Sequence, residues 1–383
     1  MPMLQLMHSI SWRALRRKAG VSLLALSMLA PQAAQACTSF LLRTTDKGAV
    51  YGRTMEFGFE LESRPLVIPR NYSFTSEGPD DKPMLSWKGK YAAVGLNAVN
   101  LTALIDGLNE KGLAGGVLYF PGFAEYADAS KTDPAKSLAP WDFLTWALTN
   151  YATVEEVKAA VNDVSVVGVM QETLKDVPPF HYTLHDATGA SIVIEPVDGK
   201  LKVYDNPLGV MTNSPSFDWH LINLGNYVKL SPGNVPPLKI GDVTIEPLGQ
   251  GSGLLGIPGD PTPPSRFVRA IAYILSVQQQ PSGPESVRLA EHILNNFDIP
   301  KGAVGKGDEI DYTQWSSIAD LDNLTYYVKT YDNQILRAID LKGFNLDGIE
   351  LLTTTLTPEV TPTPIAPAAF APSNQQQGAA PAK

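Results

Sequence analysis

The chain contains 383 residues, and its 30 Lys and Arg against 39 Asp and Glu give a formal net charge of −9. Beyond its N-terminal region this acidic chain has no cluster of Lys or Arg and lacks the positive surface that nucleic acids require, which excludes a nucleic-acid-binding protein. Beyond the N-terminal region no stretch is apolar for long enough to cross a bilayer, so no membrane span is predicted.

The first 36 residues have the three parts of a secretory signal peptide. A basic group from Arg13 to Lys18 precedes an apolar run from Val21 to Ala30, and Ala34-Gln35-Ala36 matches a small-residue cleavage site. Residues 1–36 are therefore predicted to be removed from a periplasmic or secreted protein. This removal takes away four basic and no acidic side chains, which leaves 26 (30 minus 4) against 39 and a formal charge of −13.

The single cysteine of the chain, Cys37, follows the predicted cleavage site directly. A lone thiol in an oxidising compartment is a liability unless it has a function. An N-terminal thiol also has a base beside it, because an α-amino group has an unperturbed pKa of about 7.7 to 8.0. Cys37 is therefore predicted to be a catalytic nucleophile that uses its own amine as base. Arg53 could favour the thiolate, and Glu56 could orient the amine.

After Cys37 the sequence predicts strands, because short apolar and β-branched runs alternate with Gly and Asp turns. These runs are 37–43, 49–55, 66–69, 92–96, 103–105 and 112–120. Two stretches of helical period follow at 140–148 and 154–161. The second begins behind a candidate N-cap, Thr153, with Glu156 three residues on, and the two helices are expected to pack as a pair.

The second half of the chain repeats this order of strands and helices. The predicted strands are 181–185, 191–195, 201–204, 209–212, 314–318, 324–330 and 335–341, and the predicted helices are 264–277 and 286–296. A Gly/Pro-rich stretch at 231–264 is expected to be an ordered loop or an arm. This order favours an α+β fold over alternating βαβ units. Residues 353–383 are rich in Thr, Pro, Ala and Gln and are expected to be disordered, which leaves one folded domain at 37–352.

Cys37 has two other interpretations. If the signal peptide is misassigned, Cys37 is a small buried thiol. If the chain is a lipoprotein, Cys37 is acylated and the protein is a lipid-anchored binding module with its Pro-rich tail as a spacer. Lipoprotein signals usually place Leu three residues before the cysteine and a small residue two before it, where this chain has Ala34 and Gln35. A free cysteine amine supports the enzyme, and an acylated one supports the anchor.

The histidines are expected to be structural. A Cys–His pair is formally open, but none of them forms a recognisable motif with Cys37, and their spacing does not suggest a zinc site. Those that remain after processing are His181, His185, His220 and His292.

Several longer segments carry a family resemblance when they are taken in order. They are Cys37-Thr38, Gly52-Arg53, Ile68 to Asn71, Asp106 to Leu113, Thr212 to His220, Leu248 to Gly253, Pro258 to Asp260, Ser265 to Phe267 and Tyr312 to Trp315. In these segments the chain resembles the choloylglycine hydrolase family, which contains penicillin V acylases and bile salt hydrolases. The matches run over almost the whole predicted mature length.

The resemblance implies the four-layer αββα fold of the N-terminal nucleophile hydrolases, no metal or organic cofactor, and hydrolysis of linear N-acyl amides. It implies that Cys37 is the nucleophile and that the Asn213 side-chain amide and the Tyr119 backbone N–H form an oxyanion hole, where one donor is worth about 3 to 4 kcal/mol. Arg53 and Arg266 are expected to flank the thiol. The stretch before Arg266 resembles the arm through which relatives form homotetramers.

Glu56 and Tyr119 affect two predictions, the orientation of the Cys37 α-amine and the choice of substrate. Glu56 stands where the family usually has Asp, so its carboxylate is expected to reach the α-amine by a different path or through water. Tyr119 is the residue usual in penicillin V acylases, where bile salt hydrolases commonly have Asn. The sequence therefore favours a penicillin V acylase that prefers phenoxyacetyl or long-chain acyl amides. The alternatives are a hydrolase of conjugated bile salts and an N-acyl homoserine lactone acylase.

Overall fold

The computed structural model describes residues 36–306 and 309–356. Apart from Ala36, the predicted signal peptide lies outside the described residues, and so does the predicted tail from residue 357 onward.

The first sheet has the strand order β1-β2-β17-β18-β19, and β16 pairs with β17. Its strands are β1 (Cys37–Arg43), β2 (Ala49–Phe57), β16 (Val304–Lys306), β17 (Glu309–Asp320), β18 (Thr325–Thr330) and β19 (Arg337–Asp340). The predicted hairpin of β1 and β2 forms, and it is antiparallel with Cys37 opposite Met55. Every residue of β2 is buried, because β1 and β17 flank it and both faces of the sheet are covered.

The second sheet has the order β13-β12-β11-β8-β7-β6-β3-β20. Its strands are β3 (Pro65–Ile68), β6 (Ala93–Leu96), β7 (Asp106–Asn109), β8 (Ala114–Tyr119), β11 (Phe180–His185), β12 (Ser191–Val197), β13 (Lys200–Asp205) and β20 (Leu352–Thr353). The predicted end of the folded domain after Leu352 therefore falls inside a strand. Leu352 pairs with Val67, and Thr354 N donates to Pro65 O at 3.4 Å.

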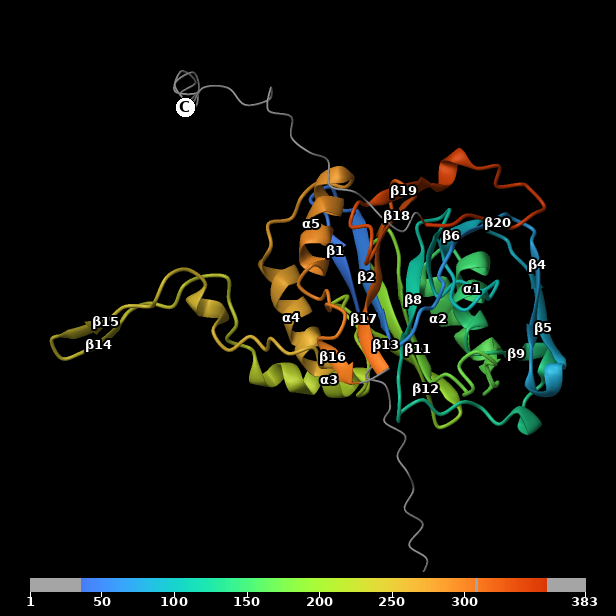
Figure 1. Cartoon of the computed structure of the whole chain (residues 1–383), viewed down its shortest axis with the longest axis horizontal. Coiled ribbons are helices and arrows are strands. Elements are labelled where there is room, and N and C mark those ends of the chain that lie inside the picture. The colour runs from blue at the N-terminus through green and yellow to red at the C-terminus, as the bar shows by residue number, and fades with distance from the viewer. Residues whose placement is uncertain (1–35, 307–308, 357–383) are drawn as a thin grey trace, which may run out of the picture. The chain divides into compact units, whose positions relative to one another are not determined.

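The two sheets face each other between outer layers of helices. α4 (Pro263–Ser276) packs on β1, α5 (Pro284–Leu294) packs on β2 and β17, and α1 (Asp142–Asn150) packs on β7 and β8. β8 contacts β1 and β2 across the interface between the sheets. Figure 1 shows α4 and α5 on one side of the strands and α1 on the other. The predicted four-layer αββα fold is thereby confirmed.

The predicted cap of α2 (Val154–Ala160) also forms. Thr153 Oγ1 accepts from Glu156 N at 3.2 Å, and the Glu156 carboxylate accepts from Ala152 N at 2.8 Å. The first bond satisfies a backbone donor that the first turn of a helix leaves unpaired, and the second ties the Glu156 side chain back to the residue before the cap. No helix among the described residues has the length and apolar character needed to cross a membrane.

Some elements differ from the prediction. The segments 103–105 and 209–212 are not strands. Ile105 lies in a connection that hydrogen-bonds to Leu96 and Val117, and Met211 forms only an isolated bridge to Ser39. Sequence periodicity missed short elements whose apolar patterns span too few residues: β4 (Ser73–Glu77), β5 (Pro83–Lys88), β9 (Ser137–Leu138), β10 (Ser165–Val166) and α3 (Phe217–Asn223).

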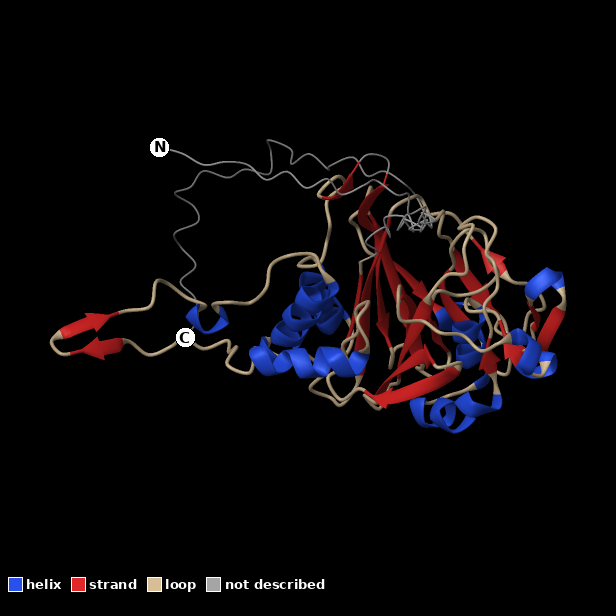
Figure 2. Cartoon of the chain, turned by 90° about the horizontal axis from the view of Figure 1, so that it is seen from below, coloured by secondary structure: helices blue, strands red, loops and turns tan. Residues whose placement is uncertain are grey.

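The Gly/Pro-rich stretch at 231–264 contains a short hairpin of its own. β14 (Leu238–Ile240) pairs with β15 (Val243–Ile245) through a turn in which Gly241 has φ 58°. A positive φ costs glycine little because it has no Cβ. Figure 2 shows this hairpin projecting away from the layers. The arm predicted from the sequence is thus present, with all six residues of its strands exposed.

Candidate active site

Cys37 is the first residue of β1 and is 3% exposed. Its partner across the hairpin is Met55, and residues opposite each other in a sheet point to the same face. The Cys37 thiol accordingly lies 3.7 Å from Met55 Sδ. Arg53, two residues before Met55, points to the same face and places Nη2 3.6 Å from Cys37 Sγ. The predicted pairing of this thiol with Arg53 is present.

The Arg53 guanidinium is fully buried between the two sheets. Nη1 donates to Ile105 O at 2.6 Å, Nη2 donates to Val117 O at 2.5 Å, and Asp106 lies 3.6 Å away. Burial alone would lower the pKa of Arg53, but the negative charges around it, that of Cys37 foremost, outweigh burial and hold this pKa above its usual value. The Arg53 guanidinium is therefore a fixed positive charge 3.6 Å from Cys37 Sγ.

Asp106 completes this buried charge cluster. The sequence analysis placed this residue in a matched segment but predicted no role for it. Its carboxylate accepts from Tyr51 at 2.8 Å, Ser317 at 2.7 Å and Tyr326 at 2.5 Å. Burial raises the pKa of Asp106, and Arg53 opposes that rise. The available signal was the acid at the start of the matched segment Asp106 to Leu113.

Asn213 and Arg266 hold the backbone of Cys37. Cys37 N donates to Asn213 Oδ1 at 2.8 Å, and Arg266 Nη2 donates to the same oxygen at 2.7 Å. Arg266 Nη1 donates to Cys37 O and to Thr38 Oγ1, the latter at 2.9 Å. Burial lowers the pKa of Arg266 to about 10. Arg266 stands in the first turn of α4, so this helix fixes the position of Cys37.

The remaining polar groups of Asn213 are also held. Its side-chain amide donates to Tyr119 O at 2.9 Å, and its backbone carbonyl lies 2.9 Å from His220 Nε2. A carbonyl can only accept, so His220 donates through Nε2–H. His220 is buried and stacks on Phe267, and its predicted structural role fits these contacts. An amide carries two N–H groups, so Asn213 keeps a second donor beside the Tyr119 carbonyl.

Glu56 is buried on β2 and is held by two threonines. Thr313 donates to Oε1 at 2.7 Å, and Thr54 donates to Oε2 at 3.1 Å. Burial raises the pKa of Glu56 to about 8, and Arg266 opposes this rise. The acceptor for Cys37 N is Asn213 and not Glu56. The expected orientation of a free amine by Glu56 therefore stays a prediction.

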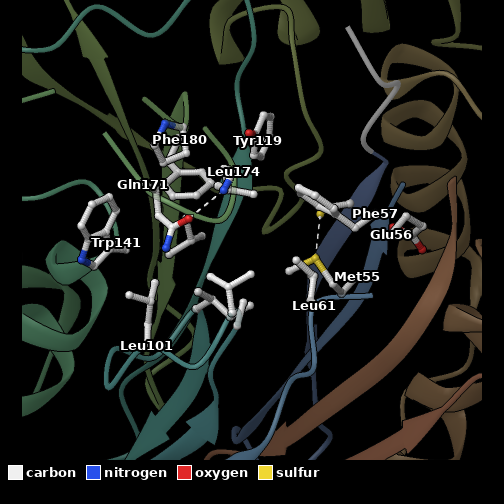
Figure 3. A pocket seen from close by; sticks show the side chains of 16 residues that line it. Met55, Glu56, Phe57, Leu61, Leu101, Tyr119, Trp141, Gln171, Leu174 and Phe180 are labelled. Carbon is white, nitrogen blue, oxygen red and sulfur yellow. Dashed lines mark hydrogen bonds between the residues drawn. The ribbon is translucent and has the colours of Figure 1, made fainter. Parts of the chain in front are cut away.

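An apolar cavity opens on the thiol and encloses about 550 Å³, its mouth included. Cys37, Glu56 and Tyr119 lie in its wall, and the Tyr119 ring packs edge-on against Phe57 and Phe180. Figure 3 shows the side chains from both sheets that surround this space. Its other lining residues are Met55, Leu61, Ala98, Val99, Leu101, Ile105, Val117, Trp141, Gln171, Leu174 and Pro178. No Lys or Arg is among them, so the cavity suits an uncharged acyl group.

The structure thus brings all six predicted site residues to one place at the inner face of the two sheets. Cys37, Arg53, Asn213 and Arg266 are joined by direct contacts, Tyr119 joins through its carbonyl, and Glu56 lines the cavity. Two other histidines bond elsewhere, His181 to Thr212 O at 2.9 Å and His185 to Thr183 at 3.0 Å. Within the described part of the chain, no histidine hydrogen-bonds Cys37.

Comparison with known proteins decides the family. Residues 37–354 match the model of the linear amide C–N hydrolases, choloylglycine hydrolase family. The chain belongs to the choloylglycine hydrolase family. It is therefore an enzyme that acts on linear amide C–N bonds, and the resemblance predicted from its segments is confirmed. Choloylglycine hydrolases named among its relatives include both bile salt hydrolases and a penicillin V acylase.

The bile salt hydrolase/transferase of Clostridium perfringens is 39% identical to this chain over 83% of the chain and 96% of that protein. The penicillin V acylase of Pectobacterium atrosepticum is 28% identical to this chain over 85% of the chain and 86% of that protein. A crystal structure of a conjugated bile acid hydrolase variant from Clostridium perfringens superposes with a TM-score of 0.76 at 34% identity, covering 86% of this chain and all of that one. These values favour the bile salt hydrolases, and the sequence-based preference for a penicillin V acylase is revised.

Glu56 yields a prediction about stability. Its ordinary pKa is 4.5, and its pKa in the fold is about 8. The folded state therefore binds the proton more tightly, so the contribution of Glu56 to stability is complete below pH 4.5 and is lost as the pH rises to about 8. One pKa unit corresponds to about 1.4 kcal/mol, so the loss amounts to a few kcal/mol.

We expect Glu56→Gln, in the uncleaved chain, to flatten this dependence. Urea unfolding at about pH 5, near the lower end of this interval, and at about pH 8.5, above it, measures the difference. The control is Glu155→Gln, because the Glu155 side chain is 83% exposed. An equally steep fall in Glu56→Gln and in the wild type would contradict the prediction.

Proposed function

We propose that the protein hydrolyses the amide bond of conjugated bile acids with Cys37 as an N-terminal nucleophile. The observation that carries the proposal is a buried thiol at the mouth of an apolar cavity in a chain that is 39% identical over 96% of a bile salt hydrolase. The cavity would take the steroid acyl group, which is apolar and large. The amino-acid part would remain on the thiol side, outside the apolar wall.

The proposed reaction begins with removal of residues 1–36 from an exported precursor. The freed amine of Cys37 takes the thiol proton, and the thiolate beside Arg53 attacks the amide carbon. The oxygen of the tetrahedral intermediate would be stabilised by the second N–H of the Asn213 side-chain amide and by the Tyr119 backbone N–H. The ammonium gives its proton to the leaving amine as the C–N bond breaks, which leaves a thioester on Cys37. The amine then takes a proton from water as the water oxygen attacks the thioester carbon, and the proton returns to the sulfur as the C–S bond breaks and the acid is released.

A second candidate, penicillin V acylase activity, rests on Tyr119. Its ring lies in the cavity wall with Phe57 and Phe180, so it narrows the space beside the thiol and would suit the flat ring of a phenoxyacetyl group. The identity values outweigh this single side chain, and we rank bile conjugates first.

We predict that kcat/KM is higher for glycine- or taurine-conjugated bile acids than for penicillin V, because the apolar cavity buries more of a steroid than of a phenoxy group. Steady-state assays of both substrate classes on the same preparation measure this ranking. A long-chain N-acyl homoserine lactone serves as a third substrate. Clearly faster turnover of penicillin V would reverse the ranking and leave the role of Cys37 unaffected.

We predict that activity requires a free amine at Cys37, because in the uncleaved chain its nitrogen is an amide that cannot accept a proton. A chain beginning at Cys37 should be active, and an uncleaved chain should be inactive. Cys37→Ser should lower kcat by orders of magnitude, since a hydroxyl is far less acidic than a thiol, and should leave the fold intact. Equal turnover by cleaved and uncleaved chains would refute the mechanism.

The intact mass of the exported protein tests the alternative interpretation of Cys37, in which this residue carries a lipid. The mass of residues 37–383 with an unmodified cysteine is the outcome that our proposal requires. An added lipid mass on Cys37 would instead support the lipid-anchored binding module.

We also propose that the arm assembles the protein into a homotetramer. Its hairpin exposes four apolar side chains that would be costly to leave in water: Leu238, Ile240, Val243 and Ile245, each between 52% and 61% exposed. We predict that Ile240→Asp reduces the assembly, as measured by analytical ultracentrifugation. Ile335→Asp is the control, because Ile335 is 58% exposed but lies outside the arm. A monomeric wild type would refute the proposal.

A further inference from the structure

The apolar cavity contains one side chain whose chemistry the hydrolysis reaction does not use. Gln171 lies in the wall and is 8% exposed, in a lining that is otherwise almost wholly apolar beyond Cys37 and Glu56. Figure 3 shows Gln171 across the cavity from Met55, Phe57 and Leu61, the residues on the thiol side. An amide N–H in such a wall needs a hydrogen-bond partner once a bound group seals it from water.

The orientation of this amide is fixed by its own loop. Gln171 N donates to Asp176 O at 2.9 Å, and Lys175 N donates to Gln171 O at 2.8 Å. The side-chain Oε1 accepts from Leu174 N at 2.8 Å. A backbone N–H can only donate, so the atom facing it must be the oxygen, and the other prong is the Nε2 amine.

The two N–H groups of Nε2 have no hydrogen-bond partner within residues 36–306 and 309–356. Figure 3 shows Nε2 on the side of Trp141 and Leu101, away from the thiol side. Leu101 is apolar, and the Trp141 indole N–H is itself a donor, so neither can accept from it. The acceptor must come from whatever fills the cavity.

We propose that Gln171 is a specificity-determining residue that donates a hydrogen bond to an oxygen on the distal part of the acyl group. Resting on the proposed function, this inference narrows the substrate to conjugates whose steroid body carries a ring hydroxyl or ring ketone far from the scissile carbonyl. An acyl group without such an oxygen leaves Nε2 desolvated and unpaired. The ether oxygen of a phenoxyacetyl group is one carbon from its carbonyl and remains near the thiol.

Binding of free steroid acids, which are the acyl products, tests Gln171 without requiring turnover. Three acids with the same side chain are compared by isothermal titration calorimetry: one without ring oxygen, one with a ring hydroxyl and one with a ring ketone. The wild type should bind the two oxygenated acids about tenfold more tightly than the bare acid, as expected for one buried hydrogen bond.

Two variants distinguish the loss of the Nε2 hydrogen-bond donor from a disturbance of the loop that holds Gln171. Gln171→Met should bring the three dissociation constants to within about twofold of one another. Gln171→Glu keeps an oxygen to accept from Leu174 N, and at about pH 8.5 its carboxylate has no N–H, so the ketone acid should lose its advantage while the loop stays in place. Met170→Ala is the matched control, because Met170 is the neighbouring residue and is 60% exposed. It should preserve the tenfold preference.

The inference is overturned if the wild type binds the bare acid as tightly as the oxygenated ones, if it binds none of them, or if both Gln171 variants keep the preference. Turnover of the conjugates by the wild type is measured alongside and tests the proposed function separately. Preferential binding that depends on Gln171, without hydrolysis of the conjugates, would refute the proposed function and leave the role of Gln171 standing.

Discussion

A guanidinium buried between two sheets is the constraint on which this site depends. Arg53 reaches from β2 to the carbonyls of Ile105 and Val117 and to the carboxylate of Asp106, all on the side of the second sheet. Removing one partner of a buried ion pair costs about 3 to 5 kcal/mol, because the other charge is left uncompensated. The contacts that hold the sheets together therefore also hold a positive charge 3.6 Å from Cys37 Sγ.

Asn213 joins the parts of the site that Arg53 does not reach. Its oxygen accepts from Cys37 N and from Arg266, its amide bonds the Tyr119 carbonyl, and its backbone carbonyl accepts from His220. A side chain held at this many points has little freedom to reorganise during a reaction. Such pre-organisation lets donors stabilise a developing negative charge without first having to move. Asn213 and Arg266 are each 1% exposed, and the low dielectric of such a buried place strengthens their interactions.

The sequence predicted the elements that have long periodic or alternating patterns, and it missed those that depend on distant contacts. The hairpin of β1 and β2 and the cap at Thr153 followed from local residue patterns. β20 has only two residues and exists because β3 offers an edge to pair with, which no local pattern reveals. The predicted strand at 209–212 failed because its pairing of Met211 with Ser39 of β1 is an isolated bridge that does not extend into a ladder.

By itself the sequence determined the family, through segments that match it in order, and it singled out one cysteine with an arginine a hairpin away. These features are local, or they are ordered matches along the chain. Only the tertiary structure decided which atoms meet. In the fold, Asn213 Oδ1 accepts from Cys37 N, and Nε2 of Gln171 faces an apolar cavity. Hydrogen bonds between residues 176 positions apart depend on how the sheets and α4 pack, and residue types alone do not encode that geometry.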